Sequence, residues 1–441
     1  MSEAGPQPRA ELSAAVTALS HDGRGIARVR GKTVFIEDAL PGETVRYRLL
    51  KKHSDYDEAQ VTGIIEASPE RVEPHCQHFG VCGSCALQHL SPEGQVAAKQ
   101  QTLLDNLQRI GGMAPLEVMP PLMGPAWGYR RRARLSAHRN TNNGKVMVGY
   151  TERHRHLITD VWHCHTLDPR VGGRIEKISE LLSGLSIADR IPQMEVAVGD
   201  DAVVLSLRVL APPNEADRQR LAAFEQEQGM RIQLQAGKPE DAVPLQGERQ
   251  TLHYRLPESG VDIAFEPSDF IQVNGEVNRS LVELAIQQLD PQPDEDVLDL
   301  FAGLGNFTLP LARKAASVTG VEGEAGLVGR ARANAQRNGI GNAQFEQANL
   351  FDEKQHGAWA KRKYARILLD PPRAGAKEIV AAFPRFGARK LVYVSCHPAT
   401  LARDAKSLVE QGWALARAGI LDMFPHTAHV ESMAVFERGK A

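Results

Sequence analysis

The strongest constraint on the fold is a regular alternation of strand and helix patterns in the carboxy-terminal half of the chain. Apolar β-type runs at 297–300, 317–322 and 391–395 are separated by helical patterns such as 324–338. Strands that alternate with helices in this way form a mostly parallel, doubly wound sheet. Ligands of such sheets bind in the crevice beyond the carboxyl ends of the strands. The sequence therefore predicts an α/β domain over residues 267–441 with its site at that edge.

One cysteine lies where a strand ends and a helix begins. Residues 391–395 are predicted to form a buried strand, and Pro398 suits the first turn of a helix over 399–411. An isolated cysteine is more often a small core residue than a reactive group. The place of Cys396 in the expected ligand crevice favours a nucleophile instead.

A glycine-rich turn, DLFAGLGNFT, joins another strand to its helix at residues 299–308. Glycines let the backbone approach a ligand closely, although they also serve simply to turn the chain. A dinucleotide site would need a small residue where Thr308 stands. Asp299 inside the strand suits a cationic or amino-acid-bearing ligand such as S-adenosylmethionine. Glu322 ends the next strand, where it is placed to accept hydrogen bonds from ribose hydroxyls.

The amino-terminal part shows short β-type runs separated by turns. The runs are 12–18, 25–29, 32–36, 45–50 and 60–65. Several short strands at this spacing indicate a small closed barrel. A group of basic side chains along it is placed to face phosphates, with an ordinary solvated edge strand as the alternative. These side chains are Arg46, Arg48, Lys51, Lys52 and His53.

Four cysteines form the most unusual spacing in the sequence, because three of them follow a C-x5-C-x2-C pattern. Four thiolates fit a [4Fe–4S] cluster or a tetrahedral zinc site. The long first gap favours the [4Fe–4S] cluster, and nearby histidines keep zinc as the alternative. The sequence thus predicts metal ligands at Cys76, Cys82, Cys85 and Cys164.

Three arginines follow in a strand-like stretch. Arg130, Arg132 and Arg134 alternate along the chain, so they share one face of a strand. Guanidinium groups on one face repel each other unless an anion or carboxylates meet them. A phosphate backbone is one such partner, and a solvated charged strand is the alternative.

Composition is that of an ordinary globular protein. A chain of 441 residues with 24% charged residues should form two or three domains. No apolar run reaches membrane-spanning length, and the opening MSEAGPQPRA lacks an apolar signal core. Five cysteines do not suggest a disulfide framework. We therefore expect a cytoplasmic protein with no membrane association, and nothing indicates an obligate protein partner.

Five segments resemble the motifs of the RNA 5-methyluridine methyltransferase family, in the same order. They are FIQVN, DLFAGLGNFTLPLA, LLDPPRAG, VSCHPATLARD and HVESMAVFER. With the barrel and the four cysteines, the resemblance covers essentially the whole chain. It implies a TRAM-like, OB-like RNA-binding barrel (1–70) and a central α+β domain with the [4Fe–4S] cysteines (71–266). It also implies a doubly wound, S-adenosylmethionine-dependent methyltransferase domain (267–441), against which 93–125 is expected to pack.

The resemblance also implies roles for single residues. The methyl donor would be contacted by Gln272, Phe301, Asn306, Glu322, Asn349 and Asp370. Cys396 would be the nucleophile and Glu431 the base in methylation of C5 of a uridine in 23S rRNA, through a covalent bond to C6. A tRNA or another rRNA uridine stays open as the target. Two rival classes are a redox or cluster-carrying protein and an RNA-binding module with a degenerate enzyme domain.

Overall fold

The computed structural model describes residues 12–153 and 155–439. The chain divides into two compact units, Met1–Ala98 with His426–His429, and Lys99–Pro425 with Val430–Ala441. The opening residues, on which the expectation of no signal peptide depends, lie outside the described part. Among the described residues, no helix is long and apolar enough to cross a bilayer.

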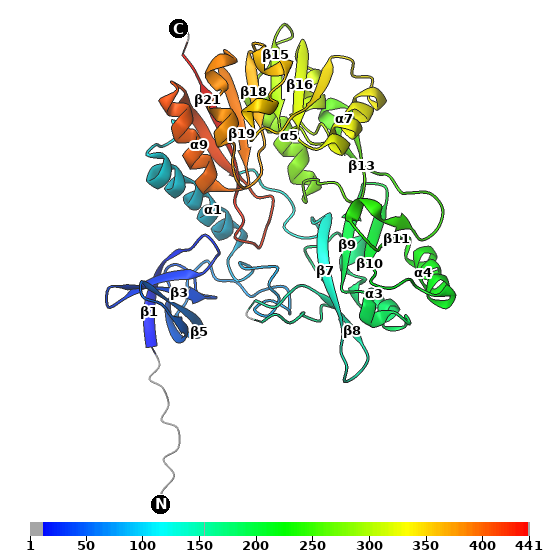
Figure 1. The fold of residues 1–441 in the computed structure, drawn as a ribbon. Helices are drawn as coiled ribbons and strands as arrows, with labels where there is room; N and C mark the ends of the chain where they lie inside the picture. Colours follow the sequence, from blue (N-terminus) through cyan, green and yellow to red (C-terminus); the bar gives the residue numbers. More distant parts are fainter. Residues whose placement is uncertain (1–11, 154, 440–441) are drawn as a thin grey trace, which may run out of the picture. The chain divides into compact units, whose positions relative to one another are not determined.

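Five strands of the smaller unit close into a barrel in the order β1-β2-β3-β5-β4 (Figure 1). The strands are β1 (Leu12–Leu19), β2 (Gly25–Val29), β3 (Lys32–Glu37), β4 (Thr44–Lys52) and β5 (Tyr56–Glu66). Alternate side chains such as Val16, Val34 and Tyr47 point inward and form the barrel core. Closure leaves no unpaired strand edge. The predicted barrel is confirmed.

In the larger unit, the central part of the chain forms a six-stranded sheet in the order β12-β11-β10-β9-β7-β8. Its strands are β7 (Arg132–Arg139), β8 (Val146–Gly149), β9 (Gln193–Val198), β10 (Val203–Arg208), β11 (Arg231–Gln235) and β12 (Val243–Pro244). The helices of this part are α2 (Pro169–Gly172), α3 (Ile175–Ser183) and α4 (Glu215–Gln228). Residues of α3 and α4 join those of the sheet in one apolar core. The expectation of mixed α and β structure is confirmed here.

The carboxy-terminal part holds an eight-stranded sheet in the order β17-β16-β15-β18-β19-β21-β20-β6. Its strands are β6 (Glu117–Val118), β15 (Asp296–Leu300), β16 (Ser317–Glu322), β17 (Ala343–Gln347), β18 (Arg366–Leu369), β19 (Lys390–Ser395), β20 (Ala414–Leu421) and β21 (Glu431–Glu437). The five strands from β17 to β19 run parallel, and β21 runs antiparallel between β19 and β20. This is the predicted doubly wound sheet.

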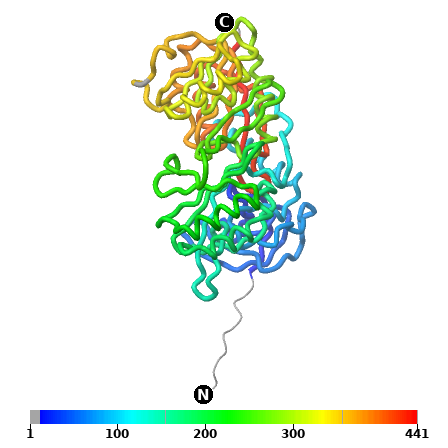
Figure 2. The backbone as a smooth tube through the Cα atoms, turned by 90° about the vertical axis from the view of Figure 1, so that its right-hand side faces the viewer, coloured from blue at the N-terminus to red at the C-terminus, as the bar shows by residue number. Residues whose placement is uncertain are grey.

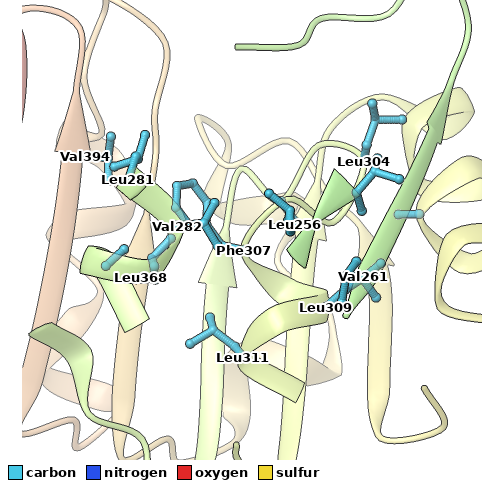
Figure 3. Packing of buried hydrophobic residues seen from close by; sticks show 14 of the residues in the cluster. Leu256, Val261, Leu281, Val282, Leu304, Phe307, Leu309, Leu311, Leu368 and Val394 are labelled. Carbon is cyan, nitrogen blue, oxygen red and sulfur yellow. The ribbon is translucent and has the colours of Figure 1, made fainter. Parts of the chain in front are cut away.

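Helices and a hairpin cover this sheet with a continuous apolar core (Figure 3). The helices of this core are α5 (Gly275–Leu289), α6 (Thr308–Ala312) and α7 (Ala325–Arg337), and the hairpin is β13 (Leu252–Leu256) with β14 (Val261–Phe265). Two further helices, α8 (Lys377–Val380) and α9 (Pro398–Glu410), pack against each other. Leu281 of α5 lies beside Val394 of β19, and the same core takes in Leu309 of α6 and Val261 of the hairpin (Figure 3). The core thereby fixes the strand ends and the loops that follow them.

A segment from much earlier in the chain completes the sheet. Helix α1 (Pro92–Asn106) continues into a π-helical turn, Leu107–Gly111, which packs against α9. Strand β6 then adds to the sheet edge by pairing in parallel with β20. Figure 2 shows this cyan stretch of chain beside the red carboxy-terminal strands. Residues 107–118 therefore fold with the sheet rather than with the six-stranded sheet that follows them in sequence.

Candidate active site

Five of the predicted site residues lie along one edge of the eight-stranded sheet. Asn349 follows β17, Glu322 ends β16, Phe301 follows β15, Asp370 follows β18 and Cys396 follows β19. The strands are parallel neighbours, so their carboxyl ends meet at the same edge. The structure thus brings together residues that are spread over about a hundred positions of sequence.

Glu431 reaches the same edge because its strand runs the other way. It is the first residue of β21, and the β19–β21 ladder pairs Ser395 with Ser432. The next residues along this register are Cys396 and Glu431, and the charge of Glu431 acts on the Cys396 thiol. Glu431 is only 3% exposed. A thiol and a buried carboxyl group therefore lie at the neighbouring ends of two paired strands.

Burial and mutual repulsion disfavour negative charge in this group of acids. Burial raises the pKa of Cys396 to about 11, with the charges of Glu431 and Asp370 adding to the effect and that of Arg373 opposing it. Burial also raises the pKa of Glu431 well above its ordinary value, and the charge of Asp370 adds to this. Groups coupled in this way do not all ionise together. At neutral pH the site without ligands therefore keeps the proton on the Cys396 thiol. A cation entering the site would favour the charged forms of the thiol and of the acids beside it.

Asp370 is joined to a second predicted residue. Nε2 of Gln272 donates a hydrogen bond of 3.3 Å to its Oδ2. Burial raises the pKa of Asp370 to about 7, and this hydrogen bond opposes the shift. The segment that carries Gln272 is anchored at buried Asn274, whose Oδ1 accepts from the Val277 N–H at the start of α5. Gln272 and Asp370 therefore act as one polar pair at the end of β18.

The glycine-rich loop is tied to the end of β16. Oε2 of Glu322 accepts from the Gly303 N–H at 3.0 Å, and its Oε1 accepts from the Glu324 N–H at 2.9 Å. Phe301 opens the loop at φ +65°, a left-handed conformation that is uncommon for a side chain of this size. Such backbone strain is typical of ligand-binding turns. The predicted acid at the strand end is thus also the residue that holds the loop.

Asp299 lies under this loop with one oxygen unsatisfied. The Thr308 hydroxyl donates to its Oδ2, whereas Oδ1 is buried and has no hydrogen-bond partner among the described residues. Burial raises the pKa of Asp299 to about 7, with the Thr308 hydrogen bond opposing and the charges of Asp370 and Glu322 adding. An amino group is the kind of donor that such an oxygen would accept. Thr308, whose size speaks against a dinucleotide site, therefore serves here as a hydrogen-bond donor to Asp299.

Asn306 has its partners inside the protein. Its Oδ1 accepts from the Tyr254 hydroxyl at 2.9 Å and from Asn278 at 3.0 Å, and its Nδ2 donates back to Asn278 at 3.0 Å. This three-residue network fixes the loop against the hairpin and α5. Sequence reasoning missed Tyr254 and Asn278, because nothing in their local pattern marks them as loop supports.

Asn349 and an aromatic neighbour line the far end of the edge. The exposed Asn349 accepts from the Phe351 N–H at 3.0 Å. The half-exposed ring of Phe351 lies with its centroid 5.8 Å from that of Phe301, at an interplanar angle of 52°. Phe351 was also missed, although an aromatic residue shortly after a predicted strand is a signal that could have found it. Aromatic faces at this position suit a planar base.

The predicted [4Fe–4S] cluster, and with it that part of the fold-class prediction, is wrong. No group of three or more His, Cys, Asp or Glu side chains within 12–153 and 155–439 is arranged to hold a metal ion. Cys76, Cys82 and Cys85 belong to the smaller unit, whereas Cys164 belongs to the larger one, where it packs against the core of the six-stranded sheet. Close spacing in sequence brings thiols near one another along the chain, but metal coordination needs their sulfur atoms to converge on one point.

Two of the three alternating arginines form ion pairs with a carboxylate, which offsets the repulsion between their guanidinium groups. Arg134 Nη2 lies 2.9 Å from Oε1 of Glu195, and Arg132 Nη2 lies 3.9 Å from its Oε2. Glu195 stands opposite Arg134 in the β7–β9 ladder. Side-chain pairing across the sheet therefore accounts for two of the three arginines.

Comparison with known proteins agrees with this geometry. A family described as tRNA (Uracil-5-)-methyltransferase matches residues 125–439, and the TRAM domain matches residues 7–62. The proteins named "23S rRNA (uracil(1939)-C(5))-methyltransferase RlmD" from Xanthomonas axonopodis pv. citri and Methylococcus capsulatus are 49% and 48% identical, each alignment covering 98% of both chains.

A solved structure shares the fold. The Pyrococcus abyssi tRNA (uracil-54, C5)-methyltransferase in complex with S-adenosyl-L-homocysteine aligns with a TM-score of 0.73 at 23% identity, over 96% of this chain and 99% of that one. At this identity the likeness establishes the architecture. Together with the match of the family over most of the chain, it leads to one conclusion: the protein belongs to the tRNA (Uracil-5-)-methyltransferase family and carries a TRAM domain at its amino-terminal end.

Proposed function

We propose that this protein transfers a methyl group from S-adenosylmethionine to C5 of a uridine in 23S rRNA. The observation that carries the proposal is the β19–β21 pairing, which ends at Ser395 and Ser432 and so brings Cys396 and buried Glu431 to the same end of the two strands. Asp370 lies at the end of the neighbouring strand and couples electrostatically to both. The names of the relatives that are 48–49% identical support 23S rRNA as the substrate.

The carboxyl edge of the sheet offers groups that fit the donor. When bound, S-adenosylmethionine supplies an electrophilic methyl group on a positively charged sulfur, together with an amino acid and a ribose. Asp299 and Asp370 are buried acids that a cationic ligand would favour in their charged forms. The residues that would hold the donor are Gln272, Phe301, Asn306, Glu322, Asn349 and Asp370.

Cys396 and Glu431 have complementary tasks in this chemistry. C5 of uracil is a poor nucleophile until the Cys396 thiol loses its proton to solvent and the thiolate bonds to C6, which moves the ring electrons towards C5. C5 then takes the methyl group, and the donor sulfur keeps the electrons of the bond that breaks, so that it leaves uncharged. Once C5 carries the new methyl group, the Glu431 carboxylate removes the C5 proton. The electrons of that C–H bond re-form the C5–C6 double bond, the C6–S bond breaks, and the thiolate leaves. The raised pKa of Glu431 suits a group that must hold this proton.

Recognition of the RNA is assigned to the rest of the chain. We propose that the target base flips out of its stack to reach the thiol, and that the barrel and the central sheet bind the surrounding RNA. The division into a barrel (1–70), a central domain (71–266) and a methyltransferase domain (267–441), with 93–125 packed against the methyltransferase domain, is part of this proposal, as is a cytoplasmic location.

Transfer of a labelled methyl group tests the proposal. Purified protein is incubated with methyl-labelled S-adenosylmethionine and either 23S rRNA or tRNA, and the modified nucleotide is mapped. We expect 5-methyluridine in the 23S rRNA, and its loss from the rRNA of cells that lack the protein. Label found only in tRNA would refute the substrate, and label on another base would refute the chemistry.

Two substitutions test the covalent route in the same assay. Cys396→Ala should abolish transfer while donor binding persists, because the sulfur bonds to the base and not to the donor. Glu431→Gln should trap a protein–RNA adduct on a denaturing gel, because the C5 proton then stays in place. The control is Glu437→Gln, the same change at the other end of β21. Full turnover by Cys396→Ser would contradict the mechanism.

A further inference from the structure

Three side chains on one face of α9 bind the backbone of the loop that follows β18. The Thr400 hydroxyl donates to the carbonyl oxygen of Arg373 at 3.2 Å, and Nη2 of Arg403 donates to the carbonyl oxygen of Ala374 at 2.9 Å. Oδ2 of Asp404 accepts from the N–H of Ala376 at 2.7 Å. Residues three and four apart share a helix face, so the three side chains act together. We call Thr400, Arg403 and Asp404 the α9 clamp.

Asp404 is the centre of the clamp. It is 1% exposed, and its Oδ2 also accepts from the hydroxyl of buried Tyr393 on β19 at 2.8 Å. Oδ1 accepts from Nε and Nη2 of Arg403 at 2.9 and 2.7 Å. A buried carboxylate with four donors is held in one position, because every alternative position would leave charge or donors unpaired. Asp404 therefore joins a strand, a helix and a loop rigidly.

The loop also packs closely against the α9 clamp at Gly375. This residue has φ +81°, and a Cβ built on it would lie 2.5 Å from Nη2 of Arg403 and 2.6 Å from Oδ2 of Asp404. Both distances are shorter than contacts between non-bonded atoms in folded proteins, so a side chain at this position would displace the clamp. The close approach is a second observation, independent of the hydrogen bonds, that loop and helix meet at a fixed spacing.

The two ends of this assembly carry the reacting groups. The loop begins at Asp370, and α9 begins two residues after Cys396. We propose that Asp404 is a positioning residue for methyl transfer: through the α9 clamp it sets the place of the Asp370 carboxylate relative to the Cys396 sulfur. The inference rests on the proposed roles of Asp370 and Cys396, and it adds a residue that touches neither substrate nor donor.

Asp404→Asn tests the clamp with little change of volume. The amide can still accept from Ala376 and Tyr393, but its NH₂ group then faces the guanidinium of Arg403. We expect kcat to fall roughly 10- to 100-fold, since misplacement of reacting groups by about 1 Å has effects of that size. KM for the RNA should stay within about threefold, because the RNA surfaces are unchanged. Amide hydrogen exchange over 370–376 should become faster, which a general loss of stability would not confine to this loop.

Asp217→Asn is the matched control. Asp217 is also 1% exposed, and its carboxylate accepts hydrogen bonds from Ser186 and from the N–H of Asn214 beside α4. It lies in the central part of the chain, outside the eight-stranded sheet. We expect a loss of thermal stability similar to that of Asp404→Asn, with unchanged kcat and unchanged exchange over 370–376.

A substitution in the loop, with a second glycine as its control, tests the same contact. Gly375→Ala should reproduce the loss of kcat, and combining it with Asp404→Asn should cost hardly more than either change alone, because both break one contact. The control is Gly412→Ala, at φ +86° with no atom within 4 Å of a new Cβ. It introduces the same backbone strain without touching the clamp, so kcat should stay as in the wild type.

Two results would overturn the inference. One is unchanged exchange over 370–376 in Asp404→Asn. The other is a loss of kcat in Asp217→Asn or Gly412→Ala equal to that in the clamp variants. If the wild-type protein transferred no methyl group to uridine, the proposed function would fail, whereas the exchange measurement would still decide whether the clamp holds the loop.

Discussion

At the scale of single residues, the site holds acidic groups where their charged forms are disfavoured. Burial raises the pKa of Asp370 to about 7 and that of Cys396 to about 11. Each shift means that folding costs free energy at a pH where the unfolded chain would ionise the group. A positively charged ligand would recover this free energy on binding, because it stabilises the ionised carboxylates. Groups with perturbed pKa values of this kind cluster at functional sites.

The pKa of Asp370 predicts a pH-dependent gain in stability for Asp370→Asn. Between pH 3.8, the ordinary value for Asp, and about 7, the folded protein binds a proton that the unfolded chain releases. The stability of the wild type therefore falls across this window as the pH rises, and an amide removes that fall. We expect the Tm of Asp370→Asn to exceed that of the wild type by roughly 2–4 °C at pH 8, with the difference vanishing towards pH 4.

Differential scanning fluorimetry from pH 4 to 8.5 would measure this difference. Asp241→Asn, at an exposed position, serves as the control and should follow the wild type throughout. A lower Tm for Asp370→Asn at pH 8 would contradict the prediction, because it would mean that the protein stabilises the ionised carboxylate. The same variant should lose methyl transfer, which would separate the cost in stability from the gain in function.

At the scale of elements, β21 and the segment before it complete the site. Glu431 opens β21, and the chain that leads towards it is anchored by Lys99 of α1. Nζ of Lys99 lies 2.6 Å from Oδ1 of Asp422 and donates to the carbonyl oxygen of Phe424 at 2.9 Å. Burial lowers the pKa of Lys99, and the charge of Asp422 opposes this shift. Both side chains are buried, so each depends on the other for its charge to be balanced.

Lys99→Met should therefore destabilise the protein strongly. Removing one partner of a buried ion pair leaves an uncompensated charge, which lowers the free energy of unfolding by about 3–5 kcal/mol. Urea unfolding would measure the change, and Lys99→Met with Asp422→Asn should recover much of it. The matched surface pair is Lys145–Asp160 at 2.7 Å, where Lys145→Met should cost less than about 1 kcal/mol. Equal losses at the two positions would refute the argument.

At the scale of the whole molecule, a small barrel accompanies a methyltransferase sheet. The closed barrel has its own core and carries basic side chains on β4, the strand Thr44–Lys52. In that strand Val45 and Tyr47 point inward, while Arg46 and Arg48 point outward. A net charge of −2 for the chain makes general attraction to RNA weak, so RNA binding depends on local groups of this kind.

Neutralising these groups should weaken RNA binding with a measurable change in its salt dependence. Replacing Arg46, Arg48, Lys51 and Lys52 by Gln should make the slope of log K against log salt shallower by roughly 2–3, at about 0.7 for each phosphate that the variant no longer neutralises. Binding of an rRNA fragment at several salt concentrations would measure it. The control replaces exposed Lys314 and Arg337, which precede β16 and β17 at the opposite edge of the sheet. An unchanged slope in the barrel variant would remove the barrel from the RNA interface.

Local patterns in the sequence predicted the elements well. The strand expected at 317–322 has those bounds in the structure, and the helical pattern expected at 324–338 forms α7, Ala325–Arg337. Apolar periodicity and turn residues are set by neighbours along the chain, so they can be seen without the tertiary fold. The sequence prediction missed β11, Arg231–Gln235, and β13, Leu252–Leu256. The turn residues Gly229 before β11 and Gly260 after β13 are signals that could have found them.

What the sequence determined by itself was the order of strands and helices, the closed barrel, and the placement of candidate residues at strand ends. Only the tertiary structure decided which of those residues meet. The β19–β21 pairing brings Cys396 and Glu431 to the same end of the two strands, and no local pattern reveals an antiparallel pairing between segments so far apart. The same reason explains the wrong prediction of a [4Fe–4S] cluster, because close spacing along the chain does not by itself make a group of metal ligands, and none is found among the described residues. Convergence is a property of the folded chain.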